Sequence, residues 1–100
     1  MTSDTRLFDA SEVLDNESAV DEFLAAAFET EDPAFIAKSL GVIAKTRNMS
    51  ALARDVGMSR AALYKSLSGE GNPEFATIIK VMKALGLGLA PVSRSNQGAA

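Results

Sequence analysis

The amino-acid sequence predicts an all-α protein of five short helices, and three observations lead to this prediction. Apolar residues recur three or four positions apart in five stretches of the chain, which is the spacing that places them on one face of a helix. Each stretch is bounded by a capping residue, a proline or a glycine. The chain has 100 residues, so we expect one domain with a small hydrophobic core.

The first helix is expected over about residues 17–30, where Asn16 or Ser18 can accept a backbone N–H at its start. The residues expected on its buried face are Val20, Phe23, Leu24, Ala27 and Phe28. The second helix is expected over about residues 33–47, because Asp32-Pro33 is typical of an N-cap followed by the first helical residue. The residues expected on its buried face are Phe35, Ile36, Leu40, Ile43 and Ala44.

The remaining three helices are shorter. Ser50 is expected to cap a helix over residues 51–56, which ends at Gly57, and Ser59 is expected to cap a helix over about residues 60–67. Pro73 is expected to open a fifth helix that Gly86 stops. The residues expected to face inward from it are Phe75, Ile78, Ile79, Met82 and Leu85. Residues 87–92 then predict a short C-terminal edge strand or an apolar tail, and residues 93–100 a frayed, disordered tail.

The third and fourth helices together have the pattern of a lambda-repressor-like helix-turn-helix. Ala53 is small where the two helices would cross, Gly57 permits the sharp turn, and Ser59 caps the second helix. The apolar residues expected to face the core are Leu52, Val56, Met58, Leu63 and Leu67. Many such motifs carry a large apolar residue at the position of Ser66, so we expect Leu67 to supply the packing instead. An ordinary helical hairpin without a role in DNA binding is the alternative.

In a helix-turn-helix, the N-terminal part of the second helix enters the major groove of DNA. The residues expected to contact DNA are Ser50, Ser59, Arg60, Ala61, Tyr64 and Lys65. Arg60 suits a guanine, whose O6 and N7 match the fork of the guanidinium group. Lys65 and Ser59 suit phosphates, and Tyr64 suits a phosphate or a thymine methyl group.

The net charge of −3 conceals an uneven distribution of charge along the chain. Residues 1–32 contain ten acidic residues and one basic residue, whereas residues 33–100 contain nine basic and three acidic residues. The basic part suits phosphate and the acidic part suits a basic partner. The first part of the acidic segment, residues 1–16, is called the arm. Apolar residues interrupt it at Leu7, Phe8, Val13 and Leu14, which favours a partner-binding arm over a merely solubilising tail.

The residue types that are missing argue against an enzyme. The chain has no cysteine and no histidine, which removes the common zinc, thiol and triad mechanisms. The stretch from Gly41 to Thr46 lacks the second glycine of a phosphate-binding loop, and Glu29, Glu31 and Asp32 lack the spacing of a calcium loop. We therefore expect no cofactor and no metal. No secretory signal is visible and the longest apolar stretch, about residues 84–92, is far shorter than a membrane span. A cytoplasmic protein without a membrane partner is expected.

Several short segments of the chain have a characteristic sequence. The most specific are Ala62-Leu63-Tyr64-Lys65 and Gly71-Asn72-Pro73. Others include Phe8-Asp9, Asp32-Pro33, Leu52-Ala53, Gly57-Met58-Ser59-Arg60 and Val81-Met82-Lys83-Ala84-Leu85-Gly86-Leu87. Through these segments, about residues 6–90 of the chain resemble a known family, the addiction-module antidote proteins. Members of this family are related to HigA-type antitoxins and carry an Xre-like helix-turn-helix.

The resemblance implies a small basic toxin of the RelE/ParE-like superfamily as partner, usually encoded next to the antidote. It also implies repression of its own operon, and a homodimer, because a palindromic operator presents two half-sites. We expect residues 1–31 to bind the toxin, residues 32–92 to form the DNA-binding domain and residues 93–100 to be the tail. The expected toxin contacts are Phe8, Asp9, Glu12, Leu14 and Asp15. The expected dimer contacts are Leu85, Leu87, Leu89 and Val92, unless this segment only covers the core.

Two other classes of binding protein fit the same residues. One is a stand-alone Xre-type transcriptional repressor without a toxin partner. The other is an interaction protein whose helix-turn-helix no longer binds DNA. An affinity for DNA that falls with salt would argue against the second class, because phosphate contacts release counterions.

Overall fold

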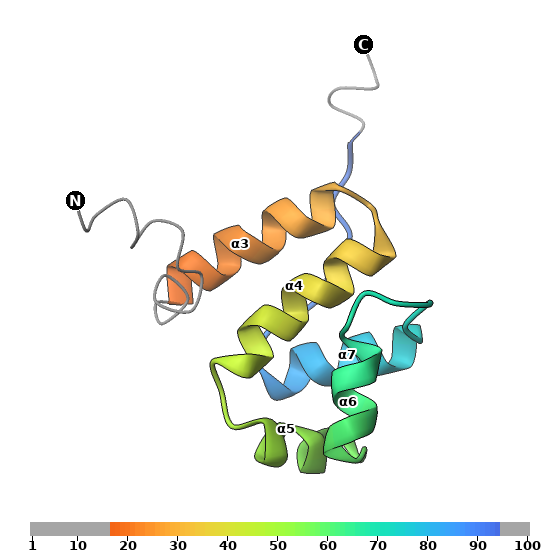
Figure 1. Cartoon of the computed structure of the whole chain (residues 1–100). Helices are drawn as coiled ribbons and strands as arrows, with labels where there is room; N and C mark the ends of the chain where they lie inside the picture. Colours follow the sequence, from red (N-terminus) through yellow and green to blue (C-terminus); the bar gives the residue numbers. More distant parts are fainter. Residues whose placement is uncertain (1–16, 95–100) are drawn as a thin grey trace, which may run out of the picture.

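The computed structural model describes residues 17–94, and this part of the chain contains five α-helices and no strand. The helices are α3 (Glu17–Glu29), α4 (Pro33–Lys45), α5 (Met49–Val56), α6 (Arg60–Ser66) and α7 (Phe75–Ala84). Figure 1 shows α3 and α4 as an antiparallel pair, with α5 and α6 at the opposite end of the molecule and α7 behind them. The predicted all-α fold of five helices is confirmed.

One hydrophobic core joins all five helices. Four of its side chains are the largest to be fully buried, namely Leu40, Ile43, Leu63 and Val81. Val20 and Leu24 from α3, together with Met49, Leu52, Ala53 and Val56 from α5, complete much of the rest. Leu67 is only 5% exposed, so it does supply the packing that Ser66 does not.

Side-chain caps fix the starts of three helices. Asp32 accepts the backbone N–H of Ala34 at 3.0 Å, and Ser59 accepts that of Ala62 at 3.0 Å, both as predicted. The predicted Ser50 cap is wrong: α5 begins at Met49, and Asn48 accepts the backbone N–H of Ala51 at 3.0 Å. Asparagine is at least as good a cap as serine, and it comes two residues earlier in the chain.

Two glycines end helices in the left-handed conformation. Gly57 ends α5 with a φ of 80°, and the backbone N–H of Met58 donates to the carbonyl of Ala53 at 2.9 Å. Gly86 follows α7 with a φ of 80°, and the N–H of Leu87 donates to the carbonyl of Met82 at 2.8 Å. Both ends are Schellman motifs, in which glycine avoids the strain that a Cβ atom would bring.

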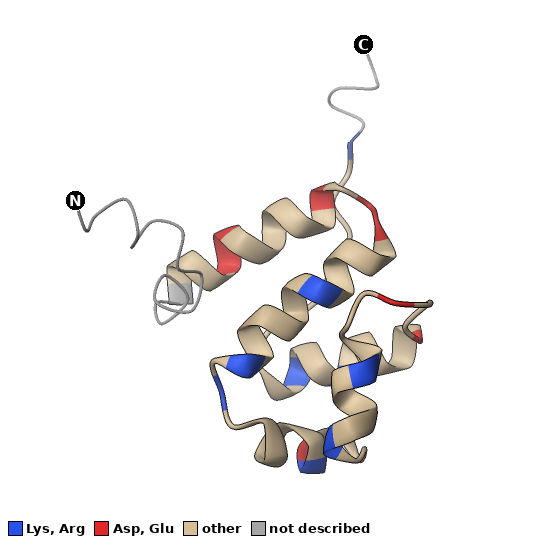
Figure 2. Ribbon diagram, viewed as in Figure 1, with Lys and Arg blue, Asp and Glu red and all other residues tan. Residues whose placement is uncertain are grey.

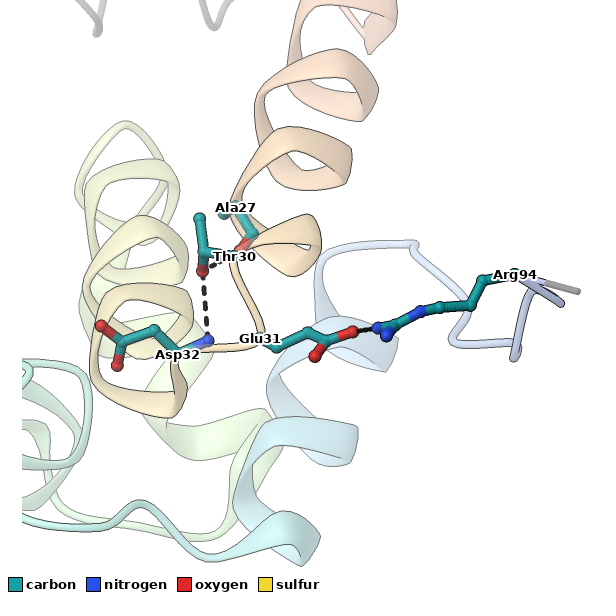
Figure 3. Close-up of polar contacts among 5 residues, drawn as sticks. All are labelled: Ala27, Thr30, Glu31, Asp32 and Arg94. Carbon is teal, nitrogen blue, oxygen red and sulfur yellow. Dashed lines mark hydrogen bonds and ion pairs between the residues drawn. The ribbon is translucent and has the colours of Figure 1, made fainter. Parts of the chain in front are cut away.

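The turn between α3 and α4 uses the same conformation without a glycine. Glu31 has a φ of 58°. The Thr30 hydroxyl donates to the carbonyl of Ala27 at 2.7 Å and accepts the backbone N–H of Asp32 at 3.1 Å, while the Glu31 carboxylate pairs with Arg94 (Figure 3). This pair ties the segment after α7 to the α3–α4 turn.

Three expected inward-facing residues lie at the surface instead. Phe35 is 46% exposed, Phe75 is 70% exposed and Ile79 is 37% exposed. Phe35 and Phe75 belong to the first turns of their helices, where the periodic pattern continues but the neighbouring helices do not cover it. α7 also begins at Phe75 with Glu74 as its N-cap, not at Pro73.

The segment after α7 was expected to form either a short strand or an apolar tail. Residues 87–94 form no strand, since this part of the chain provides no other strand to pair with; the apolar-tail alternative is the one observed. Residues 1–16 and 95–100, with the arm and most of the predicted tail, lie outside the described residues. No helix in the described part is both long and apolar enough to span a bilayer.

Candidate nucleic-acid interface

The α5–turn–α6 unit has the arrangement that the helix-turn-helix pattern predicted. Leu52, Ala53 and Val56 of α5 are at most 5% exposed, and Leu63 of α6 is fully buried. Met58, in the turn between the helices, packs against the core. The back of α6 is therefore fixed by buried apolar contacts, and its front is left for solvent or a partner.

The front of α6 is what we call the reading face, and it consists of Ser59, Arg60, Ala61, Tyr64 and Lys65. All five residues are exposed. The Arg60 guanidinium carbon lies 5.6 Å from the centre of the Tyr64 ring, within the range of a cation–π interaction. The guanidinium group therefore lies next to the ring of Tyr64, one turn further along α6. Ser50 is exposed as well, but it lies in the first turn of α5 and not on the reading face.

Acidic residues are concentrated on α3 and the α3–α4 turn, whereas the charged residues of α4 to α7 and their connections are mostly basic, with Asp55, Glu70 and Glu74 among them (Figure 2). The acidic residues Asp21, Glu22 and Glu29 of α3 are exposed, as are Glu31 and Asp32 of the following turn. Five of the nine basic residues of the described part belong to α4, α5 and α6, including Arg60 and Lys65 of the reading face. The part of the chain after residue 32 can therefore attract phosphate, although the chain as a whole is acidic.

Comparison with known proteins decides the family. Residues 4–93 match the family model described as "Probable addiction module antidote protein". The chain is also 48% identical, over 87 residues, to a protein of Haemophilus influenzae described as "Uncharacterized protein". That similarity covers 87% of this chain and 90% of the relative.

The chain is a member of the addiction-module antidote family.

Membership confirms the resemblance noted in the sequence and implies a toxin as the partner of this antidote. The description of the relative names no function, so this similarity assigns no function to the antidote. No solved structure matches the antidote.

The expected toxin contacts of the antidote, Phe8, Asp9, Glu12, Leu14 and Asp15, lie outside the described residues. The acidic side chains of Asp21, Glu22 and Glu29, on α3 after this arm, are exposed. Whether the arm binds a toxin therefore stays a prediction.

The expected dimer contacts divide into two pairs. Leu85 and Leu87 are half-buried against the antidote's own core. Leu89 is 40% exposed and Val92 is 89% exposed, so these two side chains remain available to a partner. An open hollow of about 840 Å³ lies between α3 and residues 87–94, and Phe28, Leu89 and Val92 line it together with Glu29. Sequence spacing could not reveal this hollow, because α3 and residues 87–94 are far apart in the chain.

The phosphate-binding loop and the calcium loop, for which the sequence lacks the required patterns, would lie on α4 and around the α3–α4 turn. Gly41 lies in the middle of α4, so the stretch after it is helical and forms no phosphate-binding loop. Among the described residues, no three acidic side chains are placed to hold a metal ion.

Proposed function

We propose that this antidote is the antitoxin of a type II toxin–antitoxin module. It neutralises a RelE/ParE-like toxin by direct binding and represses its own operon through the helix-turn-helix, as a cytoplasmic homodimer without catalytic activity. The observation that carries the DNA-binding part is the reading face: an exposed, basic helix surface whose opposite side is anchored by Leu63 and Leu67.

The proposed roles on DNA follow from the chemistry of each side chain. Arg60 reads a guanine, because its planar fork can donate two hydrogen bonds to O6 and N7. Lys65 contacts a phosphate as a point charge. The Ser59 hydroxyl already accepts the N–H of Ala62 at 3.0 Å, but its proton is free to donate to a phosphate oxygen. Tyr64 contacts a phosphate or a thymine methyl group while its ring supports Arg60.

The acidic end supports the proposal for toxin binding. Asp21, Glu22 and Glu29 of α3 face solvent, and Glu29 stands in the last turn, where the helix dipole disfavours a negative charge. A basic toxin would offset that cost. In the arm, Asp9, Glu12 and Asp15 would pair with basic toxin residues while Phe8 and Leu14 would fill apolar pockets.

A homodimer would place two reading faces about one turn of DNA apart. Leu89 and Val92 are the residues of the expected dimer contact that a second copy could reach without disturbing the core. The acidic side chains of Glu29 and Glu31 line the same hollow, so a symmetric contact there has to keep these carboxylates apart.

The first experiment is a growth test. Cells express the small basic protein encoded next to the antidote, with and without the antidote itself. We expect the neighbour to arrest growth and the antidote to restore it. If the neighbour is harmless by itself in cells that demonstrably produce it, the stand-alone Xre-type repressor becomes the better explanation.

A second experiment separates the two binding activities. Arg60→Ala is expected to weaken operator binding and leave toxin neutralisation intact, with Lys83→Ala on α7 as the matched control on another helix. Deletion of residues 1–16 is expected to do the reverse. Equal operator affinity for wild type and Arg60→Ala would remove Arg60 from the reading face, and unchanged toxin affinity after the deletion would refute the arm as the toxin site.

A further inference from the structure

A second basic surface adjoins the reading face. A hollow of about 560 Å³ lies between α4 and α6, and we call it the lysine hollow. Lys38 and Lys45 of α4 and Lys65 of α6 line it, and Val42 and Met49 form part of its apolar lining. Three cations around one concave surface repel one another and raise the local concentration of anions.

Two glycines bring these lysines together. A Cβ atom at Gly41 would lie 2.7 Å from the carbonyl oxygen of Leu67, so α4 approaches the end of α6 as closely as a backbone without a side chain permits. A Cβ atom at Gly69 would lie 2.8 Å from the Cγ and Cδ atoms of Lys38, so the stem of Lys38 lies directly over this loop. The hollow therefore depends on local sequence features of both segments that form it.

Among the described residues, no carboxylate forms an ion pair with the three lysines of the lysine hollow. In the described part of the chain, the ion pair with a carboxylate joins Arg94 to Glu31 and involves none of these lysines. Glu70 also lines the hollow but forms no ion pair with its lysines. The basic side chains are thus free to bind an external anion.

The helix dipole accounts for the positions of Lys45 and Lys65 in their helices, but not for the position of Lys38. Lys45 and Lys65 stand in the last turns of their helices, where a cation is favoured for reasons of stability alone. Lys38 stands in the middle of α4 and has no such reason to be basic. It is therefore the residue that best separates a structural role from a binding role.

We propose that the lysine hollow binds phosphates of the DNA strand that flanks the groove occupied by α6. The interface then extends from α6 onto α4, with Lys38 and Lys45 as additional phosphate contacts. Ala61 and Tyr64 belong both to the reading face and to the lining of the hollow, so DNA that covers the reading face also passes over the hollow. This inference rests on the proposed DNA binding.

The test measures how affinity for DNA depends on salt. Binding of the full chain to a mixed-sequence duplex about two helical turns long is measured between about 0.05 and 0.2 M salt, for wild type and for the double variant Lys38→Gln with Lys45→Gln. The matched control is Lys80→Gln, which removes an exposed lysine from the middle of α7. Glutamine keeps most of the lysine stem and removes its charge.

Each lost phosphate contact lowers the slope of log affinity against log salt by about 0.9. The double variant is therefore expected to lose about 1.8 from the slope, which at 0.1 M salt corresponds to roughly an eightfold loss of affinity for each lysine. Lys80→Gln is expected to retain the wild-type slope. Lys38→Arg is expected to retain it too, since arginine keeps both the charge and a stem that can lie over Gly69.

The possible outcomes separate phosphate binding by the lysine hollow from the proposed DNA binding in general. If wild type binds with a salt-dependent affinity and the double variant has the same slope, the lysine hollow is not part of the interface, although the DNA binding stands. If Lys80→Gln lowers the slope as much as the double variant, the effect belongs to overall charge and the inference fails. If wild type binds no duplex, the proposed DNA binding fails and this inference fails with it.

Discussion

Gly41→Ala is the substitution that most directly tests the contact between α4 and α6. Gly41 is buried in the middle of α4. The added methyl group would meet the carbonyl oxygen of Leu67 at 2.7 Å and the Cβ atom of Leu67 at 3.3 Å. The first of these atoms belongs to the backbone, so no side-chain rotation can relieve the clash.

Two opposing effects set the expected magnitude. Alanine in the middle of a helix is favoured over glycine by about 1 kcal/mol. A carbon–oxygen contact needs about 3.3–3.6 Å, so α4 and α6 must separate by more than half an ångström, and overpacking of this kind costs about 1–3 kcal/mol. Because the obstacle is backbone, we expect the upper part of that range and a net loss of about 1–2 kcal/mol in the free energy of unfolding.

Urea unfolding and thermal melts of the full chain measure this change. The melting temperature should fall by roughly 4–16 °C. The chain has one tyrosine and no tryptophan, so the fluorescence of Tyr64 on α6 also reports any displacement of the reading face. Gly88→Ala is the control, because a Cβ atom there meets nothing within 4 Å. A Gly41→Ala protein more stable than wild type would show that helix propensity decides and that the close approach of α4 and α6 is not as described.

Three further substitutions test other parts of the fold. Ser59→Ala removes the cap of α6 and should cost about 1 kcal/mol in urea unfolding; an unchanged midpoint would mean that the hydrogen bond to Ala62 contributes nothing. Leu63→Ala empties a fully buried position and should cost about 2–5 kcal/mol, so a fully folded variant with wild-type melting behaviour would contradict the core described here. Glu31→Gly relieves a positive φ of 58° and should stabilise the protein by about 1 kcal/mol, since the exposed pair with Arg94 contributes only about 0–1 kcal/mol; a destabilised variant would show that this ion pair outweighs the backbone strain.

Much of the fold could be predicted from the sequence because local signals and periodicity agree. Asp32-Pro33, Gly57, Ser59 and Gly86 mark helix ends in the sequence, and each performs that role in the structure. The buried residues of each helix were harder to predict at the ends of the helix than in its middle. Periodicity shows which side of a helix is apolar but not how far its neighbours extend, so Phe75 was expected inside and lies largely outside.

The candidate site could be predicted only where it lies on one short segment. The reading face comes from consecutive turns of α6, so spacing along the chain was sufficient to find it. The lysine hollow combines Lys38 and Lys45 with Lys65, and they come together only because α4 closely approaches Leu67 at the end of α6. The same is true of the pair between Glu31 and Arg94, whose partners are far apart in the sequence.

The contacts of α3 with the other helices determine how easily it unfolds by itself. α3 packs chiefly on α4, whereas α5 packs on both α6 and α7. Detaching α3 would expose Val20, Leu24 and Ala27 but leave the contacts among α4 to α7 in place. Local opening of this kind requires less free energy than global unfolding. Amide hydrogens of α3 should therefore exchange with solvent sooner than those of α5, and we expect α3 to unfold locally while the helix-turn-helix stays folded.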